Sequence, residues 1–342
     1  MSNYWAKRFE KIEDETHKYS IEYFKQVDKA YTKAIEDIEK EISTWYMRFA
    51  TENNISYSEA LKILNTRDLK AFRMSVEEYI EKGQSLDPKF AKELEQVSVK
   101  VHVTRLEALK MQMQMQCDAL HTVTLNAIDA MAVKTFTEHY YKTLYTIQNN
   151  CKVGFNVMKL NTKVINEAFN RSWAKDGKIF SDRLWENKNK LIAELDTTFT
   201  QNLIRGKNPK VIVEEVAKRL NVSKSNVCRL FMTENKMLQS KAQQKSFKEL
   251  GVKQYKISAT FDLKTSQICQ EMHDHIFNMN EFAVGVTAPP FHPYCRTTTV
   301  PYDEDDKFFD FERGARDKDG KYITIPSSMT YNEWKEKFIT SQ

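Results

Sequence analysis

The sequence predicts a mainly α-helical protein with an elongated helical N-terminal region and a small C-terminal α+β module. Its 342 residues include only 8 glycines and 7 prolines, so few positions interrupt a helix. Apolar residues recur every three or four positions through the first 150 residues, as they do on one face of a helix. Five of the seven prolines lie after residue 288, where this texture changes. Long helices therefore share the chain with one short, proline-rich module.

The N-terminal region carries the clearest helical pattern. Its first apolar series consists of Ile21, Phe24, Val27, Tyr31, Ile35, Ile38, Ile42 and Trp45. Capping sequences predict further helix starts at Ser56, Ser75 and Asp87. Helices without glycine-rich loops suit assembly by packing on neighbours better than they suit the positioning of catalytic groups. We therefore expect an assembly region here.

The pattern divides the chain into four parts. In order, these are a helical assembly region (1–150), a basic helical segment (151–250), a small α+β module (251–302) and an acidic C-terminal tail with a short helix (303–342). The module begins where residues 252–261 partly alternate between apolar and polar, as a strand does: Tyr255, Ile257 and Ala259 share one side.

The net charge of +5 conceals an uneven distribution. Residues 1–151 hold 21 Lys/Arg and 23 Asp/Glu, residues 152–256 hold 22 and 10, and residues 257–342 hold 9 and 14. The three sums are −2, +12 and −5. A segment this basic favours a polyanion such as DNA without sequence preference, and solvated lysines on helix faces are the equal alternative. The residues expected to contact phosphates are Lys207, Lys210, Arg219, Lys224 and Arg229.

Within the basic segment, residues 216–230 have the spacing of a helix-turn-helix. The turn is expected at residues 221–223, and the second helix would present Lys224, Ser225, Asn226 and Arg229. One interpretation is a sequence-reading DNA regulator. The other is a structural pair of helices joined by a polar turn, a pattern that many all-α proteins share.

The most specific feature is a set of thiols and an imidazole around a proline-rich loop. Cys269, His292 and Cys295 are the ligand types that zinc prefers, and proline would hold the loop still. His273 is a candidate fourth ligand, because it follows Cys269 by four residues. Alternatively, the cysteines are small buried residues and His292 bonds a backbone carbonyl. Zinc is the one cofactor that the sequence suggests.

Other classes of protein receive less support. The chain lacks the common nucleotide-binding, metalloprotease and serine-hydrolase motifs, so we expect no enzyme. A thiol hydrolase with Cys269 as nucleophile, His292 as base and Asp262 as orienting group is the remaining enzymatic alternative. No charge-free apolar run approaches the roughly 18 residues of a membrane span, and the charged first residues do not read as a secretion signal. Five scattered cysteines indicate a reducing compartment.

The thiol motif also carries a family resemblance. The residues in question are Asp262-Leu263-Lys264-Thr265-Ser266-Gln267-Ile268-Cys269, then Gly285, then Pro289-Pro290-Phe291-His292-Pro293-Tyr294-Cys295-Arg296-Thr297-Thr298. This order resembles the signature of the phage head morphogenesis family, the Mu F-like minor head proteins of tailed bacteriophages. The resemblance covers about residues 180–335. It departs from fuller members of the family at Met272 and Thr297, where those members have cysteine.

The resemblance implies a minor capsid component, recruited to the prohead near the portal and packaged beside the DNA. Its implied partners are the portal protein, a scaffold or major capsid protein, and double-stranded DNA bound non-specifically, with no membrane. Its implied location is the virion interior, after assembly in the host cytoplasm, and some such proteins leave with the genome. The residues that carry the structural motif are Asp262, Thr265, Ser266, Pro290, Pro293 and Arg296.

Overall fold

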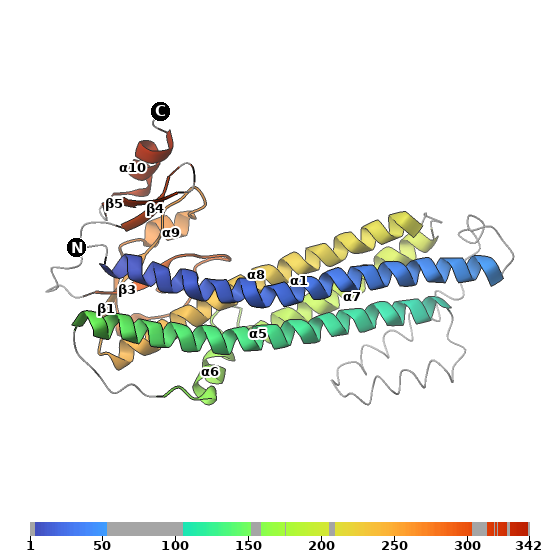
Figure 1. The fold of residues 1–342 in the computed structure, drawn as a ribbon, viewed down its shortest axis with the longest axis horizontal. Coiled ribbons are helices and arrows are strands. Elements are labelled where there is room, and N and C mark those ends of the chain that lie inside the picture. The colour runs from blue at the N-terminus through green and yellow to red at the C-terminus, as the bar shows by residue number, and fades with distance from the viewer. Residues whose placement is uncertain are drawn as a thin grey trace. The chain divides into compact units, whose positions relative to one another are not determined.

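The computed structural model describes residues 4–52, 105–151, 159–174, 176–204, 209–302, 313–317, 319, 321–326 and 329–340. Most of these residues are helical, and the strands that they include all follow residue 253 (Figure 1). The predicted fold class, mainly α with a small C-terminal α+β module, is confirmed.

The long helices precede the first strand. They are α1 (Tyr4–Glu52), α5 (Arg105–Cys151), α6 (Thr162–Phe169), α7 (Phe180–Ile204) and α8 (Pro209–Glu249). The C-terminal part contains β1 (Gln254–Ser258), α9 (Gln267–Met272), β2 (Ile276–Asn278), η1 (Met279–Glu281), β3 (Thr298–Tyr302), β4 (Arg313–Arg316), β5 (Tyr322–Ile325), α10 (Tyr331–Lys335) and η2 (Glu336–Thr340).

Helix α1 follows the apolar period of the sequence. Val27, Tyr31, Ile38 and Ile42 are buried, as expected for one face of an amphipathic helix. Ile21 differs, because 44% of its surface is exposed. The helix starts predicted at Ser56, Ser75 and Asp87 lie outside the described residues.

The helix-turn-helix prediction is wrong. Helix α8 runs without interruption from Pro209 to Glu249, so the expected turn at residues 221–223 is helical. The polar side chain of Ser223 is buried, and its Oγ lies 2.9 Å from the Tyr31 hydroxyl and accepts a hydrogen bond of 2.8 Å from Asn187. The turn-like residue thus serves helix packing, and no separate recognition helix exists here.

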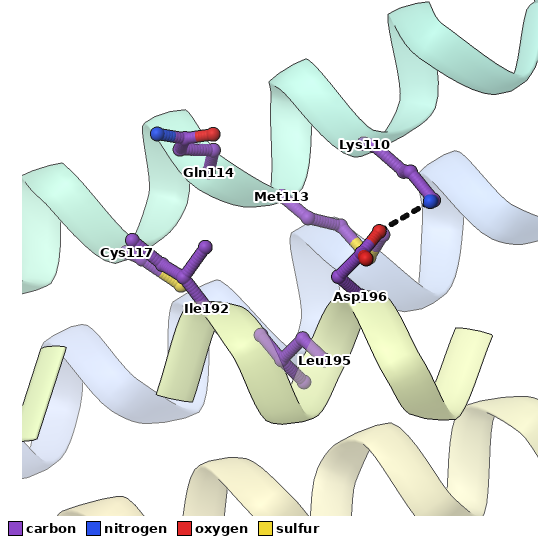
Figure 2. Close-up of a pocket in the computed structure, with 7 residues that line it drawn as sticks. All are labelled: Lys110, Met113, Gln114, Cys117, Ile192, Leu195 and Asp196. Atoms are coloured by element: carbon purple, nitrogen blue, oxygen red, sulfur yellow. Dashed lines mark ion pairs between the residues drawn. The ribbon is translucent and has the colours of Figure 1, made fainter. Parts of the chain in front are cut away.

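The described contacts divide the chain into two compact units, and both are built from separated stretches. One comprises residues 26–125 and 184–227, the other residues 1–25, 126–183 and 228–342. In the first unit, Lys188 bonds Asp118 at 2.9 Å. Figure 2 shows a pocket of this unit, across which Lys110 and Asp196 form an ion pair. The other side chains that line this pocket are Met113, Gln114, Cys117, Ile192 and Leu195.

The second unit contains a small antiparallel sheet in the order β2-β1-β3. Tyr255 of β1 faces Phe277 of β2 and Pro301 of β3 in the register. Tyr255 and Ile257 are fully buried, so the predicted strand and its apolar side are confirmed. Trp5 of α1 and Phe247 of α8 belong to the same apolar cluster, so both helices contribute to the core beside this sheet.

Candidate metal centre

The structure brings Cys269, His292 and Cys295 together in the second unit. Their ligand atoms all lie within 4.8 Å of one another. The Cys269 Sγ is 3.1 Å from His292 Nε2 and 3.7 Å from Cys295 Sγ. Both cysteines are buried and the histidine is half-buried. The cluster therefore has one side toward solvent.

A tight turn and a helix cap position Cys269. The Thr265 hydroxyl accepts a 2.8 Å hydrogen bond from the Asp262 amide, which closes the turn before α9. Ser266 is the N-cap of α9, and its Oγ accepts from the Cys269 amide at 3.4 Å. The Arg296 guanidinium binds both carboxylate oxygens of Asp262, at 2.5 and 2.6 Å. This bidentate pair ties the turn to the residue that follows Cys295.

The opposite side of the cluster is a proline-rich loop. The Pro289–Pro290 bond is cis, and Pro290 is buried while Pro293 is exposed. Gly285, which precedes this loop, has φ +84, a conformation that side chains with a Cβ rarely adopt. A Cβ at this position would also lie 3.3 Å from the Trp173 ring. The backbone angle therefore favours glycine here, and any larger residue would also have to displace the Trp173 ring slightly.

A backbone carbonyl orients the His292 ring. The His292 Nδ1 lies 2.7 Å from the Pro293 carbonyl oxygen, which can only accept, so Nδ1 carries the hydrogen. This leaves Nε2 facing the Cys269 sulfur. Metal-bound histidines commonly donate their second ring N–H to a carbonyl in this way. The same hydrogen bond also fits the alternative given above, in which His292 binds a backbone carbonyl and holds no metal.

The three side chains of the cluster shift one another's pKa values. Burial opposes ionisation of Cys295, but hydrogen bonds from Cys269 and His292 and the nearby Lys236 charge hold its pKa well below its usual value. The hydrogen bond to Cys295 and burial together raise the pKa of Cys269. The hydrogen bond to Cys295 raises the pKa of His292. A bound metal ion would replace the protons held between these atoms.

The spacing of the donor atoms fits zinc. Bond lengths of about 2.3 Å to sulfur and about 2.0 Å to nitrogen, at tetrahedral angles, place two sulfurs about 3.8 Å apart and sulfur and nitrogen about 3.5 Å apart. The observed separations of 3.7 and 3.1 Å lie close to these values. Two thiolates and one imidazole are also the donor types that select zinc over harder cations.

The structure does not bring His273 to the cluster. Helix α9 ends at Met272, so His273 is its C-cap and does not follow Cys269 around a helical turn. The His273 Nδ1 accepts from the Ala259 amide at 3.1 Å, and its Nε2 lies 3.3 Å from Asp274.

The arrangement that a thiol hydrolase would need is not formed either. Asp262 bonds Arg296 and His292 bonds Pro293, so Asp262 does not orient His292.

The predicted phosphate-contacting residues have different surroundings. Lys207 lies outside the described residues, and Lys210 and Arg229 are exposed. Arg219 is half-exposed, with its guanidinium 3.7 Å from Glu194. Lys224 forms a 2.9 Å ion pair with Asp28. The positive charge of Lys224 is therefore paired more closely than that of Arg219.

A buried ion pair lies near the cluster and was not predicted from the sequence. The Lys236 ammonium of α8 contacts the Glu13 carboxylate of α1, and the side chain of Lys236 is only 4% exposed. Thr298, three residues after Cys295, donates to the other Glu13 oxygen at 2.8 Å. Burial raises the pKa of Glu13. No periodic signal in the sequence relates residues 13 and 236, so this pair could not be found from it.

A second buried carboxylate, Glu234, lies on α8. Glu234 is 1% exposed and accepts from the Trp173 indole N–H at 3.2 Å. Burial raises the pKa of Glu234 to about 7. Lys241, about two helical turns further along α8, donates to the carbonyls of Ala168 and Arg171 at 2.5 and 3.2 Å. These contacts fasten the segment after α6 to α8.

The raised pKa of Glu234 predicts a pH-dependent stability. The folded state holds this proton more tightly than the unfolded chain, whose pKa is near 4.5. The resulting stabilisation is complete below pH 4.5 and is lost as the pH rises through 7, by about 3 kcal/mol in all. Urea unfolding at pH 5 and pH 8 should therefore show a wild-type loss that Glu234→Gln lacks. Glu214→Gln, at an exposed site of the same helix, should behave as wild type, and equal pH dependence in all three proteins contradicts the prediction.

The fold and the site define a helical protein with a small thiol–imidazole module suited to a structural metal. Residues 193–300 match the family described as Phage Mu protein F like protein, and this range includes the C-terminal part of α7, all of α8 and the three clustered ligands. The chain therefore carries a Phage Mu F-like domain, and the predicted phage head morphogenesis family is confirmed. Searches of curated proteins and of solved structures found no significant match.

The family implies a role in phage head morphogenesis and points to a structural protein with partners in the capsid. None of the helices in the described part of the chain has the length and apolar character that crossing a bilayer needs.

Proposed function

We propose that this protein is a minor head protein of a tailed phage, incorporated into the prohead near the portal. The observation that carries the proposal is the Phage Mu F-like match, which spans both the long basic helix and the complete thiol module. Its partners are the portal protein and a scaffold or major capsid protein. It assembles in the host cytoplasm, lies inside the virion and leaves with the DNA on ejection.

Cross-linking in isolated proheads tests the location. A lysine-reactive reagent followed by mass spectrometry should give cross-links between this protein and the portal protein, because α1 and α8 carry exposed lysines such as Lys29 and Lys218. Proheads assembled without portal protein are the control and should lose these cross-links together with most of the protein. Cross-links confined to the outer capsid surface would exclude the proposed position.

The Cys269, His292 and Cys295 cluster acts, in this proposal, as a structural zinc centre. The ion would join α9 to the proline-rich loop by bonds stronger than the thiol contacts that the structure shows. The module has only a small sheet, so its apolar core provides limited stability. Bonds from the three side chains to a metal ion would add to that stability.

The second part of the proposal is non-specific association with packaged DNA. The +12 charge of residues 152–256 supports it, since phosphate binding by lysine and arginine releases counterions and needs no base contacts. The uninterrupted α8 favours this mode over sequence reading, because it lacks the separate recognition helix that a regulator would use.

Charge reversal on α8 should weaken DNA binding unequally. Arg219→Glu and Arg229→Glu should each lower retention on random duplex DNA about tenfold at 50 mM salt and reduce the salt dependence. Lys224→Glu should lower it less than Arg219→Glu, because Lys224 lies 2.9 Å from Asp28 whereas Arg219 lies 3.7 Å from Glu194. Lys40→Glu, on the exposed face of α1 outside the basic segment, is the matched control. Equal losses for Lys40→Glu and the two arginine variants would remove the basic segment as the contact.

A further inference from the structure

The two clustered cysteines lie with their sulfur atoms in van der Waals contact. The Cys269 and Cys295 sulfurs are 3.7 Å apart, and the residues are separated by 26 positions in the chain. A disulfide needs the sulfurs about 2.05 Å apart, so an approach of about 1.7 Å completes the bond. Two other cysteines have different surroundings. Cys117 is buried and lines the pocket of Figure 2, and Cys228, which is on α8, lies beside Tyr294.

We propose that Cys269 and Cys295 form a redox site, in which a small hydroperoxide converts the pair into a disulfide and thereby abolishes metal binding. The disulfide itself rests only on the contact between the sulfurs. The loss of metal rests in addition on the proposed zinc centre. A disulfide sulfur is a poor zinc ligand, so oxidation removes two of the three donors.

The reaction balances with hydrogen peroxide as the oxidant. One sulfur attacks a peroxide oxygen, the O–O bond breaks, and the products are a sulfenic acid and water. The second sulfur then attacks the sulfenic sulfur, so the S–S bond forms, the S–O bond breaks, and a second water leaves with the thiol proton. In total, two thiols lose two electrons and two protons, and one peroxide becomes two waters.

The surroundings of the pair select the oxidant by size. The two cysteines are 2% and 5% exposed, so a bulky aromatic disulfide cannot reach them, whereas peroxide is little larger than water. The half-buried His292 lies at the open side of the cluster. Cys269 and Cys295 belong to one buried cluster, whereas Pro293 and Tyr294, which precede Cys295, are exposed, so the approach needs only a local shift of this loop.

The redox state would follow the location of the protein. Thiol pools in a host cytosol keep such a pair reduced, whereas no such pool protects a released particle. The proposed function therefore makes the module metal-binding during assembly and disulfide-bonded afterwards. The chemistry can be tested on the purified full chain without any capsid.

The experiment treats the purified chain with hydrogen peroxide and follows mass, peptides and zinc. The expected result is a loss of two hydrogen masses, one peptide linked through Cys269 and Cys295, and release of one zinc ion per disulfide, all reversed by dithiothreitol. A bulky aromatic disulfide should react slowly in the folded state and quickly in urea. Cys228→Ser is the matched control and should behave as wild type.

A second variant separates the two proposals. His292→Gln removes one metal ligand but keeps both thiols, so it should lose zinc and still form the disulfide, with a native helical signal by circular dichroism. If sulfinic acid accumulates at either cysteine, or if Cys228 supplies the partner sulfur, the redox site is refuted. If the disulfide forms in a wild-type protein that never binds zinc, the redox site stands and the zinc centre does not.

Discussion

Replacing Lys236 with methionine should lower the free energy of unfolding by about 3–5 kcal/mol. The methionine fills the same space, but it leaves the Glu13 carboxylate buried without its cation. Thr298 alone then bonds the carboxylate oxygens, and the pKa of Glu13, already raised by burial, should rise further. Urea denaturation of the full chain, followed by far-ultraviolet circular dichroism at pH 7, measures the loss.

A double variant distinguishes pairing from packing. Glu13→Gln combined with Lys236→Met removes both charges and should recover most of the lost stability, since a buried pair contributes little beyond neutral residues of its size. Lys11→Met is the surface control, because the Lys11 side chain is 77% exposed, and it should change stability by less than about 0.5 kcal/mol. A loss below 1 kcal/mol for the single Lys236→Met change would contradict a buried ion pair.

Cys295→Ser should abolish zinc binding. A serine hydroxyl does not ionise near neutral pH, so only two of the three donors remain. Elemental analysis should show one zinc per wild-type chain and none in the variant. At a zinc concentration a thousandfold above its Kd, the ion stabilises the wild type by about 4 kcal/mol, and the variant should show no zinc-dependent gain.

Cys228→Ser is the matched control for the loss of a thiol. Cys228 is half-buried on α8 and lies outside the ligand cluster, so this variant should keep stoichiometric zinc. A chelator should reduce the wild type and Cys228→Ser to the stability of Cys295→Ser. Wild-type protein that carries no zinc, even after refolding with the metal, would leave the cluster a hydrogen-bonded thiol–imidazole group.

Local patterns in the sequence were sufficient to predict α1 and the first strand. The apolar period places Val27, Tyr31 and Ile38 on the buried face of α1, because a single helix face sets that period. The alternation around Tyr255 and Ile257 likewise locates β1. Both signals depend only on neighbours within a few positions along the chain.

The same reasoning failed where tertiary contacts override a local preference. The sequence around Ser223 has the polar character of a turn, but Ser223 turns its hydroxyl inward to Tyr31 and Asn187 and remains helical. Tyr31 belongs to a helix that begins at residue 4, so the deciding partner is almost two hundred positions away. A pattern read over about fifteen neighbouring residues cannot reveal a partner that far away in the sequence.

The metal centre was partly accessible from the sequence. The convergence of Cys269, His292 and Cys295 followed from residue types around a proline-rich loop, and the structure brings the three together. The placement of His273 depended on where α9 ends, which residue spacing alone does not fix. The partners of Asp262 and Glu13 are set by long-range packing. Those contacts join residues that lie far apart in the sequence.

The contact between Trp173 and Gly285 links the evolution of two distant segments. Any side chain at position 285 meets both an unfavourable backbone angle and an indole ring, whereas a smaller residue at position 173 would leave Glu234 without its indole donor. Neither position can therefore change freely by single steps. Among relatives of this chain, tryptophan at 173 and glycine at 285 should be inherited as a pair, and lineages that lost the tryptophan should have replaced the buried carboxylate as well.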